Sequence, residues 1–296
     1  MEKSQCTKPG TGYAVVAGAI GKRGYAGGAV GAAWGLLAFI ERSLVMNAYL
    51  VKIAALVLCV ISLAIAHADN LKKGIGLAES EGLGEDQLKA LRVGWYYNWG
   101  PKSAIKTQLP FVPMAFRISG IEKLPHNSPI VLGFNEPDNE KQSNVSVSQA
   151  LCAWPALQGR TQLAGAPAMA KNPIKKDSWL MEFMAGSPKV DFMTLHWYKG
   201  ADARKFIADV ETLCETYRKP VWVTEFAPQT AGDARAKPER YSQAEVEAFI
   251  QETTQWMEKS DCVHRYAWHD AKVGTSALFD GRELSATGRA YAQASN

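Results

Sequence analysis

The sequence contains no run of lysine or arginine, and this absence argues against a nucleic-acid-binding protein. Its 33 Lys and Arg residues are balanced by 29 Asp and Glu, so the net charge of +4 is mild, whereas nucleic-acid surfaces need clustered basic residues. No G-x-G-x-x-G turn follows an early apolar segment, which argues against dinucleotide binding. No spacing of cysteine and histidine resembles a zinc site. The composition, 47% hydrophobic and 21% charged, is that of an ordinary globular protein.

A secretory signal peptide is predicted at residues 46–68, well inside the sequence. A short segment with one lysine precedes an apolar run over residues 53–66, and the triplet A-H-A then offers a cleavage site. We interpret Met46 as the true start and residues 1–45 as an upstream extension with a mis-called start. The alternative is a longer, uncleaved membrane anchor. The exported protein, secreted or periplasmic, would comprise residues 69–296.

Cysteine is scarce after the expected cleavage site. Cys152, Cys214 and Cys262 are the cysteines of that part, and an exported protein folds in a compartment where disulfides form. One disulfide with one free thiol is compatible with the sequence, and so are three reduced core cysteines, because pairing cannot be deduced from the sequence alone.

Short apolar segments recur along residues 69–296, each the length of a buried parallel strand. A capping box opens a helix at Ser242, and further helices are expected at residues 203–217 and 148–158. This alternation predicts one α/β domain, a single (β/α)8 TIM barrel, with an open doubly wound sheet as the alternative. The expected strands are residues 91–97, 111–116, 130–134, 162–166, 191–198, 221–226 and 264–268, with a weak eighth at 116–121.

Two glutamates end apolar segments and stand out as candidate catalytic residues. Glu136 closes V-L-G-F-N-E, and Glu225 closes V-W-V-T-E-F. The carboxyl ends of all strands of a TIM barrel open on one face, so both carboxylates would face the same cleft. Glycoside hydrolysis needs such a pair, because one carboxyl group protonates the leaving oxygen while the other attacks the anomeric carbon or activates water.

The order of these motifs resembles that of glycoside hydrolase family 128, the Asl1-like glycosyl hydrolase catalytic domain. The resemblance covers roughly residues 88–292 and is carried by W-Y-Y-N-W-G, F-V-P-M, G-F-N-E-P-D, D-F-M-T-L-H-W-Y, V-W-V-T-E-F-A and R-Y-A-W. It implies a retaining (β/α)8 barrel that acts on β-1,3-glucan, with Glu136 as the acid/base and Glu225 as the nucleophile. It implies no metal and no organic cofactor.

The same resemblance suggests which neighbours of the glutamates bind substrate. Asn135 would hold the sugar 2-hydroxyl, and His196 or Tyr198 would orient the nucleophile or bind hydroxyl groups. Aromatic side chains at the strand ends are candidate stacking surfaces, although the alternation of side chains lets only some of them face the cleft. The predicted substrate-binding set is Asn135, Tyr97, Trp99, His196, Trp197, Tyr198 and Trp268, whereas Trp95, Trp222 and Trp256 are expected in the core.

The predicted function is an endo-acting β-1,3-glucanase that retains anomeric configuration. A non-catalytic β-glucan-binding protein on the same barrel is one alternative, but a binder has no need of both glutamates. A hydrolase of another β-linked glycan is a second alternative, because a carboxylate pair does not specify the linkage. A structural ion pair of Glu225 with Arg265 is the simplest non-functional interpretation. The expected partner is a β-1,3-glucan polysaccharide or oligosaccharide, with no nucleic acid and no protein partner, and the protein is expected to be a monomer.

Overall fold

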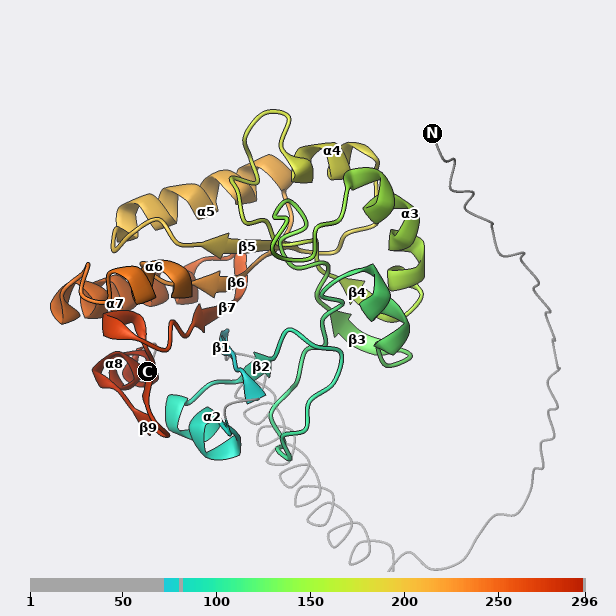
Figure 1. Ribbon diagram of the computed structural model, residues 1–296. Helices are drawn as coiled ribbons and strands as arrows, with labels where there is room; N and C mark the ends of the chain where they lie inside the picture. Colours follow the sequence, from blue (N-terminus) through green and yellow to red (C-terminus); the bar gives the residue numbers. More distant parts are fainter. Residues whose placement is uncertain (1–71, 80–81, 295–296) are drawn as a thin grey trace, which may run out of the picture. The chain divides into compact units, whose positions relative to one another are not determined.

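The computed structural model describes residues 72–79 and 82–294, and the expected signal peptide and upstream extension lie outside these residues. Short parallel strands alternate with helices along the described part (Figure 1). The parallel strands are β1 (Lys73–Gly76), β2 (Trp95–Tyr97), β3 (Ser128–Val131), β4 (Thr161–Ala164), β5 (Met193–Trp197), β6 (Val221–Phe226) and β7 (Val263–His269).

The strands close into a ring of eight positions. β1 pairs with β2 on one side and with β7 on the other, β5 and β6 continue from β7, and β3 pairs with β4. Residues 111–114 fill the third position, because they bridge β2 at one end and the residue after β3 at the other. A bridge from Gly165 to Phe192 joins the end of β4 to the start of β5. The predicted (β/α)8 barrel is thereby confirmed.

The first barrel strand is the element that sequence patterning missed. β1 reads K-G-I-G, which is too short and too rich in glycine to stand out as an apolar strand. The glycines are required, because a Cβ on Gly74 would lie 2.3 Å from the indole of Trp95 and one on Gly76 would lie 2.9 Å from that of Trp99. The weak strand expected at residues 116–121 is wrong, since most of that segment belongs to the 3-10 helix η2 (Ile118–Lys123).

Helices surround the ring of strands on its outside (Figure 1). The three helices expected from the sequence are present, and the hydroxyl groups of Ser146 and Ser242 cap two of them through full capping boxes. The helices are α2 (Glu85–Leu91), α3 (Val147–Gln158), α4 (Trp179–Ala185), α5 (Ala203–Tyr217), α6 (Ala231–Ala236), α7 (Gln243–Lys259) and α8 (Ala286–Gln293). After β7 follow the 3-10 helix η3 (Gly274–Ser276) and an antiparallel hairpin of β8 (Phe279–Asp280) and β9 (Glu283–Leu284).

The hydrophobic core has two layers, as the alternation of side chains along barrel strands requires. The larger layer lies between strands and helices, where Phe206 of α5 and Phe249 of α7 pack on Phe226 of β6. The smaller layer consists of Trp95, Tyr97, Val112, Met114, Leu132, Phe192, Trp222 and Ala267. Because its members come from strands all around the ring, this layer fills the barrel interior. Trp95 and Trp222 are thus core residues, as expected.

Two lysines at the start of β1 form hydrogen bonds with the ends of α7 and α8. The ammonium of Lys72 donates to the carbonyls of Met257, Glu258 and Ser260 at the end of α7. Lys73 does the same at the end of α8. Since the last carbonyls of a helix lack partners within it and carry the negative end of the helix dipole, these cations stabilise both helix ends.

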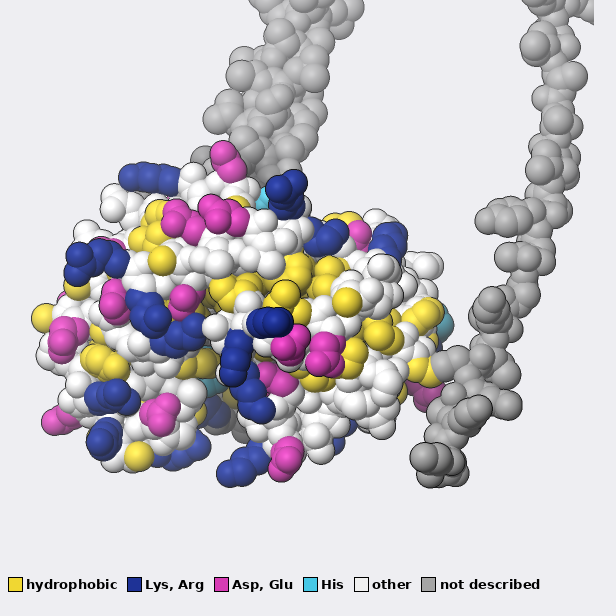
Figure 2. Space-filling view, turned by 90° about the horizontal axis from the view of Figure 1, so that it is seen from above, with side chains coloured by type: hydrophobic (Ala, Val, Ile, Leu, Met, Phe, Trp, Pro, Cys, Tyr) yellow, Lys and Arg dark blue, Asp and Glu magenta, His cyan; other side chains and the backbone are white. Residues whose placement is uncertain are grey.

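The surface carries charges of both signs. On the face shown in Figure 2, Lys and Arg side chains are interspersed with Asp and Glu, and no patch of one sign dominates. Within residues 72–79 and 82–294, every helix is too short or too polar to cross a membrane.

A disulfide joins Cys214 in the last turn of α5 to Cys262 directly before β7. The question that the sequence left open is thus answered for this pair. The two cysteines are 48 residues apart in the sequence, and the bond connects helix α5 to the start of strand β7. A cross-link over a loop of this length stabilises the fold mainly by restricting the unfolded chain.

We predict that replacing both Cys214 and Cys262 by serine lowers the free energy of unfolding by about 2–4 kcal/mol, because the unfolded chain regains the freedom that the cross-link removes. Urea unfolding monitored by tryptophan fluorescence measures the change. A reducing agent should lower the stability of the natural protein toward that of the variant. Equal unfolding midpoints for both proteins in the absence of reductant would show that the bond contributes nothing.

Candidate active site

A bulge in β6 turns Glu225 into the mouth of the barrel. Val221, Val223 and Phe226 face the helices, whereas Trp222 faces the barrel interior. Strict alternation would therefore send Glu225 outward with the two valines. Instead, the register shifts, because Leu195 pairs with Val223 while the next residue of β5 pairs with Glu225, which leaves Thr224 unpaired. The extra residue reverses the direction of the carboxylate.

Glu136 reaches the same mouth from the loop after β3. Its backbone has a φ of +43°, in the left-handed region that non-glycine residues seldom adopt. Hydrogen bonds hold this conformation: the amide of Glu136 donates to Ala168 over 2.8 Å, and the amide of Asn139 donates to the carbonyl of Glu136 over 3.0 Å. The side-chain amide of Asn139 also donates to Glu136 Oε2 over 3.2 Å. A strained backbone held in this way is typical of functional sites.

Three aromatic side chains donate hydrogen bonds to the Glu225 carboxylate. Trp99 Nε1 donates to Oε1 over 2.7 Å, and the hydroxyl of Tyr97 lies 3.3 Å from the same oxygen. The hydroxyl of Tyr198 donates to Oε2. Burial first, and then the negative charge of Glu225, raise the pKa of both phenols well above the usual value. The phenols therefore stay protonated and act as donors.

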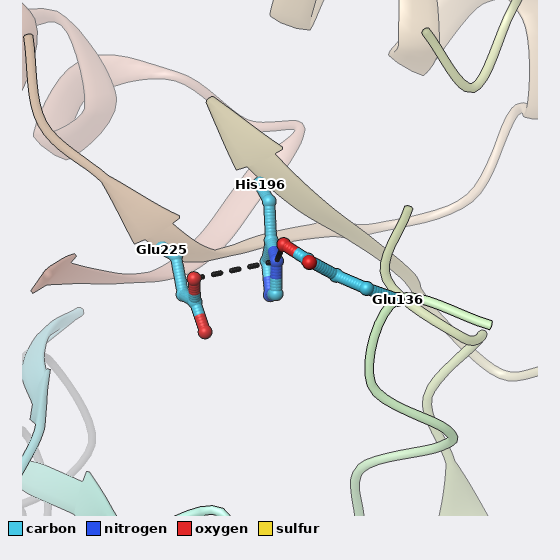
Figure 3. Close-up of side chains that lie close together, drawn as sticks. All are labelled: Glu136, His196 and Glu225. Carbon is cyan, nitrogen blue, oxygen red and sulfur yellow. Dashed lines mark hydrogen bonds and ion pairs between the residues drawn. The ribbon is translucent and has the colours of Figure 1, made fainter. Parts of the chain in front are cut away.

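His196 lies between the two glutamates (Figure 3). Its Nδ1 is 3.0 Å from Glu136 Oε1 and 3.3 Å from Glu225 Oε2. One oxygen of each carboxylate and Nδ1 all lie within 4.8 Å of one another, and all three residues are buried. The imidazole comes from the end of β5, so three different barrel positions supply the cluster.

The pKa of Glu225 is held below its usual value. Burial alone would raise it, because a carboxylate loses its hydration inside a protein. The opposing and larger combined effect comes from positive charge on His196 and His269 and from the hydrogen bonds of Tyr198 and Trp99. Glu225 is therefore ionised at neutral pH, as a nucleophile must be.

The pKa of His196 is shifted upward. Burial alone would lower it, but the charge of Glu225, the hydrogen bond to Glu136 and the charge of Glu136 together raise it. The shift favours an imidazolium that neutralises part of the negative charge of the pair. These three atoms are of the types that bind a divalent metal, but the 3.0 Å between Nδ1 and Glu136 Oε1 is the length of a direct hydrogen bond.

A cleft of about 340 Å³ opens above the cluster. Both glutamates line it, together with Asn135 and Trp99. The backbone of Trp99 has a φ of +60° and that of Lys272 has a φ of +65°, so the cleft holds two further strained residues besides Glu136. Its other walls are Gly76, Leu77, Ala78, Leu83, Phe116, Gln142, Ala231, Arg235, His269, Asp270 and Lys272.

Several of these wall residues carry no signal in the sequence. Leu77 follows a strand that patterning missed, and Arg235 lies on the short helix α6, which precedes the predicted helix at Ser242. Gln142 lies seven residues beyond Asn135, whose side-chain amide donates to it over 3.4 Å. Loop residues reach the cleft through tertiary folding, so strand ends alone do not reveal them.

The predicted substrate-binding residues divide into three groups. Asn135 and Trp99 line the cleft itself. Tyr97, His196 and Tyr198 instead form hydrogen bonds with the glutamates. Tyr97 is fully buried, so its expected role as a stacking surface for sugar is wrong, and its position is that of a donor to Glu225.

Trp197 and Trp268 lie outside the cleft, and the prediction that they contact sugar is wrong. Trp197 is 1% exposed and stacks on Phe249 of α7, and its Nε1 donates to Asp209 of α5. Trp268 is fully buried and donates to the carbonyl of Ser276. Each lies next to an inward-facing residue on its strand, so alternation turns it toward the helices.

Two further sequence features are explained by contacts outside the cleft. Lys199, which follows the β5 motif, forms an ion pair of 2.9 Å with Asp209. Arg265 stacks over the indole of Trp222, with its guanidinium carbon 4.5 Å from the ring centre. The expected alternative of an ion pair between Glu225 and Arg265 is not what the structure shows, because the donors to Glu225 include Trp99 and Tyr198.

Comparison with known sequences identifies related proteins. The profile of the family described as glycosyl hydrolase catalytic core matches residues 76–291. Alkali-sensitive linkage protein 1 from Schizosaccharomyces pombe is 29% identical over 212 residues, which are 67% of this chain and 38% of that protein. The chain thus spans well under half the length of that relative.

Solved structures share the fold. An endo-β-1,3-glucanase of glycoside hydrolase family 128, subgroup I, from Amycolatopsis mediterranei is 29% identical, with a TM-score of 0.67 over 75% of this chain and 98% of that chain. It was solved with laminaripentaose as a variant that carries alanine in place of a glutamate, and with laminaritriose and laminaribiose when a different glutamate was replaced. An oligosaccharide-binding protein of subgroup VII from Trichoderma gamsii is 25% identical, with a TM-score of 0.63 over 76% of this chain and 94% of that chain.

The electrostatic coupling between Glu225 and His196 predicts that the pKa of His196 depends on the charge of Glu225. Replacing Glu225 by glutamine should lower the pKa of His196, because the negative charge of Glu225 is the largest influence that raises it. NMR titration of protein with isotope-labelled histidine measures the change. The matched control is Glu252→Gln on the exposed side of α7, which should leave the His196 titration as it was. An unchanged His196 pKa in Glu225→Gln would contradict the coupling.

Proposed function

The chain belongs to the glycosyl hydrolase catalytic core family, as an Asl1-like domain of glycoside hydrolase family 128, and we propose that it is a retaining endo-β-1,3-glucanase. One observation carries the proposal: two buried glutamates from different barrel positions meet in one cleft, and one oxygen of each carboxylate lies within 4.8 Å of one oxygen of the other. Retaining enzymes hold their carboxyl groups ~5–5.5 Å apart, whereas inverting enzymes leave ~6.5–9.5 Å for a water molecule. The short separation favours double displacement.

In the first step, a carboxylate oxygen of Glu225 attacks the anomeric carbon of the bound glucosyl unit. The glycosidic bond breaks, and the leaving oxygen takes a proton from Glu136, so that a glycosyl ester forms on Glu225. The pKa of Glu225 is suited to this role, because burial is outweighed by neighbouring imidazoles and by hydrogen bonds that keep the carboxylate charged. Asn135 lines the cleft, and we expect it to hold the sugar 2-hydroxyl beside the nucleophile.

In the second step, Glu136 is a carboxylate and removes a proton from water. The water oxygen attacks the anomeric carbon from the face that the leaving group occupied, and the ester bond to Glu225 breaks. Two inversions therefore restore the original configuration. His196 Nδ1 lies 3.0 Å from Glu136 and 3.3 Å from Glu225. It can therefore stabilise the negative charge on Glu225 before the first step and on Glu136 after it.

The substrate is proposed from the relatives and the chemistry of the site together. The Amycolatopsis enzyme is an endo-β-1,3-glucanase solved with laminari-oligosaccharides, and the cleft here offers the polar groups and indole that a neutral glycan needs. The Trichoderma protein binds oligosaccharides, so a non-catalytic glucan-binding role is the second candidate. The pair of glutamates, with Glu225 kept ionised, favours the enzyme.

We propose that the protein acts outside the cytoplasm. β1 begins at Lys73, shortly after the predicted cleavage site at residue 68, so cleavage there leaves every barrel strand intact. The disulfide between Cys214 and Cys262 fits an oxidising compartment. An exported glucanase would meet its polymeric substrate directly.

Replacing either glutamate by glutamine should reduce the release of reducing sugar from linear β-1,3-glucan by at least about 100-fold, because glutamine neither donates a proton nor forms the ester. The controls are cellulose and xylan as substrates, and the variant Glu182→Gln on the exposed side of α4, which should retain activity. Binding of insoluble β-1,3-glucan without cleavage by the natural protein would support the binding role and contradict the enzyme.

The hydrogen bond from Tyr198 predicts a change in pH dependence. Glu225 works only when ionised, so the acid limb of kcat/KM follows its lowered pKa. Tyr198→Phe removes a charge-assisted hydrogen bond to the carboxylate, so the pKa of Glu225 should rise and the acid limb should move upward by about one pH unit. Tyr217→Phe is the matched control, because that hydroxyl bonds to the carbonyl of Pro173. An unmoved acid limb in Tyr198→Phe would contradict the assignment of Glu225 as the ionised nucleophile.

A further inference from the structure

His269 is a polar residue of the cleft whose part in the double displacement is limited to the positive charge that helps to keep Glu225 ionised. It is the last residue of β7, and its side chain lines the cleft beside Glu225. Neither proton transfer nor ester formation uses it. A histidine at the mouth of a barrel, next to the nucleophile, is a candidate for substrate contact.

The orientation of the His269 ring is fixed by two aromatic neighbours. Its plane meets Trp99 at 74° with ring centres 5.9 Å apart, and it meets Tyr198 at 88° with ring centres 5.4 Å apart. Both neighbours donate hydrogen bonds to Glu225. The imidazole is therefore held between the two side chains that position the nucleophile, and its polar edge is preorganised.

The loop that follows His269 is also fixed. The Asp270 carboxylate accepts the backbone N–H of Lys272 over 3.0 Å and that of Leu278 over 2.9 Å. Asp270 is itself buried. These bonds anchor both ends of the turn, so the end of β7 forms a rigid wall of the cleft.

The two ring nitrogens of His269 have different surroundings. Nδ1 is buried and has no hydrogen-bond partner among the described residues. Because the ring is part-exposed at the cleft and Nδ1 is closed off, Nε2 is the nitrogen that can face a ligand. Buried N–H groups without a partner are rarer in proteins than buried acceptors without one. We therefore leave Nδ1 bare in the uncharged tautomer and place its N–H on Nε2, which carries an N–H in the charged ring as well.

We propose that His269 is a specificity-determining residue, which donates a hydrogen bond from Nε2 to a hydroxyl oxygen of the glucosyl unit that Glu225 attacks. This inference rests on the proposed function, because it places a neutral sugar in the cleft. The ring lies against two donors to Glu225, so the sugar unit bound at the nucleophile lies within its reach. A fixed N–H donor recognises a hydroxyl group, and a site built for such a bond discriminates against sugars that lack it.

Three substitutions of His269 separate the parts of this proposal. Glutamine places an amide near the position of Nε2, asparagine places one near Nδ1, and phenylalanine keeps the ring edge but has no nitrogen. Affinity for laminaripentaose is measured by calorimetry in the Glu136→Gln protein, which should not cut it, and kcat/KM is measured in the natural background. We expect phenylalanine and asparagine to weaken binding about tenfold and glutamine to restore it to within about threefold.

His264→Phe is the matched control, because His264 lies on the same strand with an exposed side chain outside the cleft. It should leave affinity unchanged. Full affinity in His269→Phe, or rescue by asparagine but not by glutamine, would overturn the proposed contact. Binding without cleavage by the natural protein would contradict the proposed glucanase activity. The affinities of the His269 variants for laminaripentaose would still test the proposed hydrogen bond. Absence of binding would overturn both.

Discussion

The buried, ionised carboxylate of Glu225 is the constraint on which the rest of the site depends. An unpaired carboxylate inside a protein costs several kcal/mol, so this one requires donors. Trp99 and Tyr198 provide direct hydrogen bonds, and the imidazole of His196 adds positive charge. Of the three aromatic donors to the Glu225 carboxylate, Tyr97, Trp99 and Tyr198, Trp99 alone also lines the cleft.

The strain in the cleft follows from the same requirement. Glu136 and Trp99 both have left-handed backbones, which cost of order 1–3 kcal/mol each. The Glu136 carboxylate is linked to Glu225 through His196, and the indole N–H of Trp99 donates to Glu225 directly. The glycine at position 76 leaves room for that indole. The two strained residues lower the free energy of unfolding, and the packing of the barrel and the disulfide offset this cost.

Much of this arrangement could be predicted from the sequence because it depends on local patterns. Apolar segments ending in acids indicated Glu136 and Glu225, and capping boxes indicated α3 and α7. The bulge at Thr224 could not be predicted, since strict alternation would turn Glu225 toward the helices. Alternation does hold at Trp197, and applying it strictly there would have excluded that indole from the cleft. β1 does not stand out in the sequence, because its glycines are required by tertiary contacts with the indoles of Trp95 and Trp99.

A covalent double displacement requires that the carboxyl groups of Glu225 and Glu136 lie close together. The most direct test is proton NMR of the anomeric signals during the first minutes of laminaripentaose hydrolysis, before mutarotation mixes the products. If Glu225 and Glu136 act as nucleophile and acid/base, the β-anomer of the new reducing end appears first and the α-anomer accumulates later. Initial appearance of the α-anomer would show inversion, and would mean that the short separation of the carboxylates does not reflect a nucleophile and its acid/base.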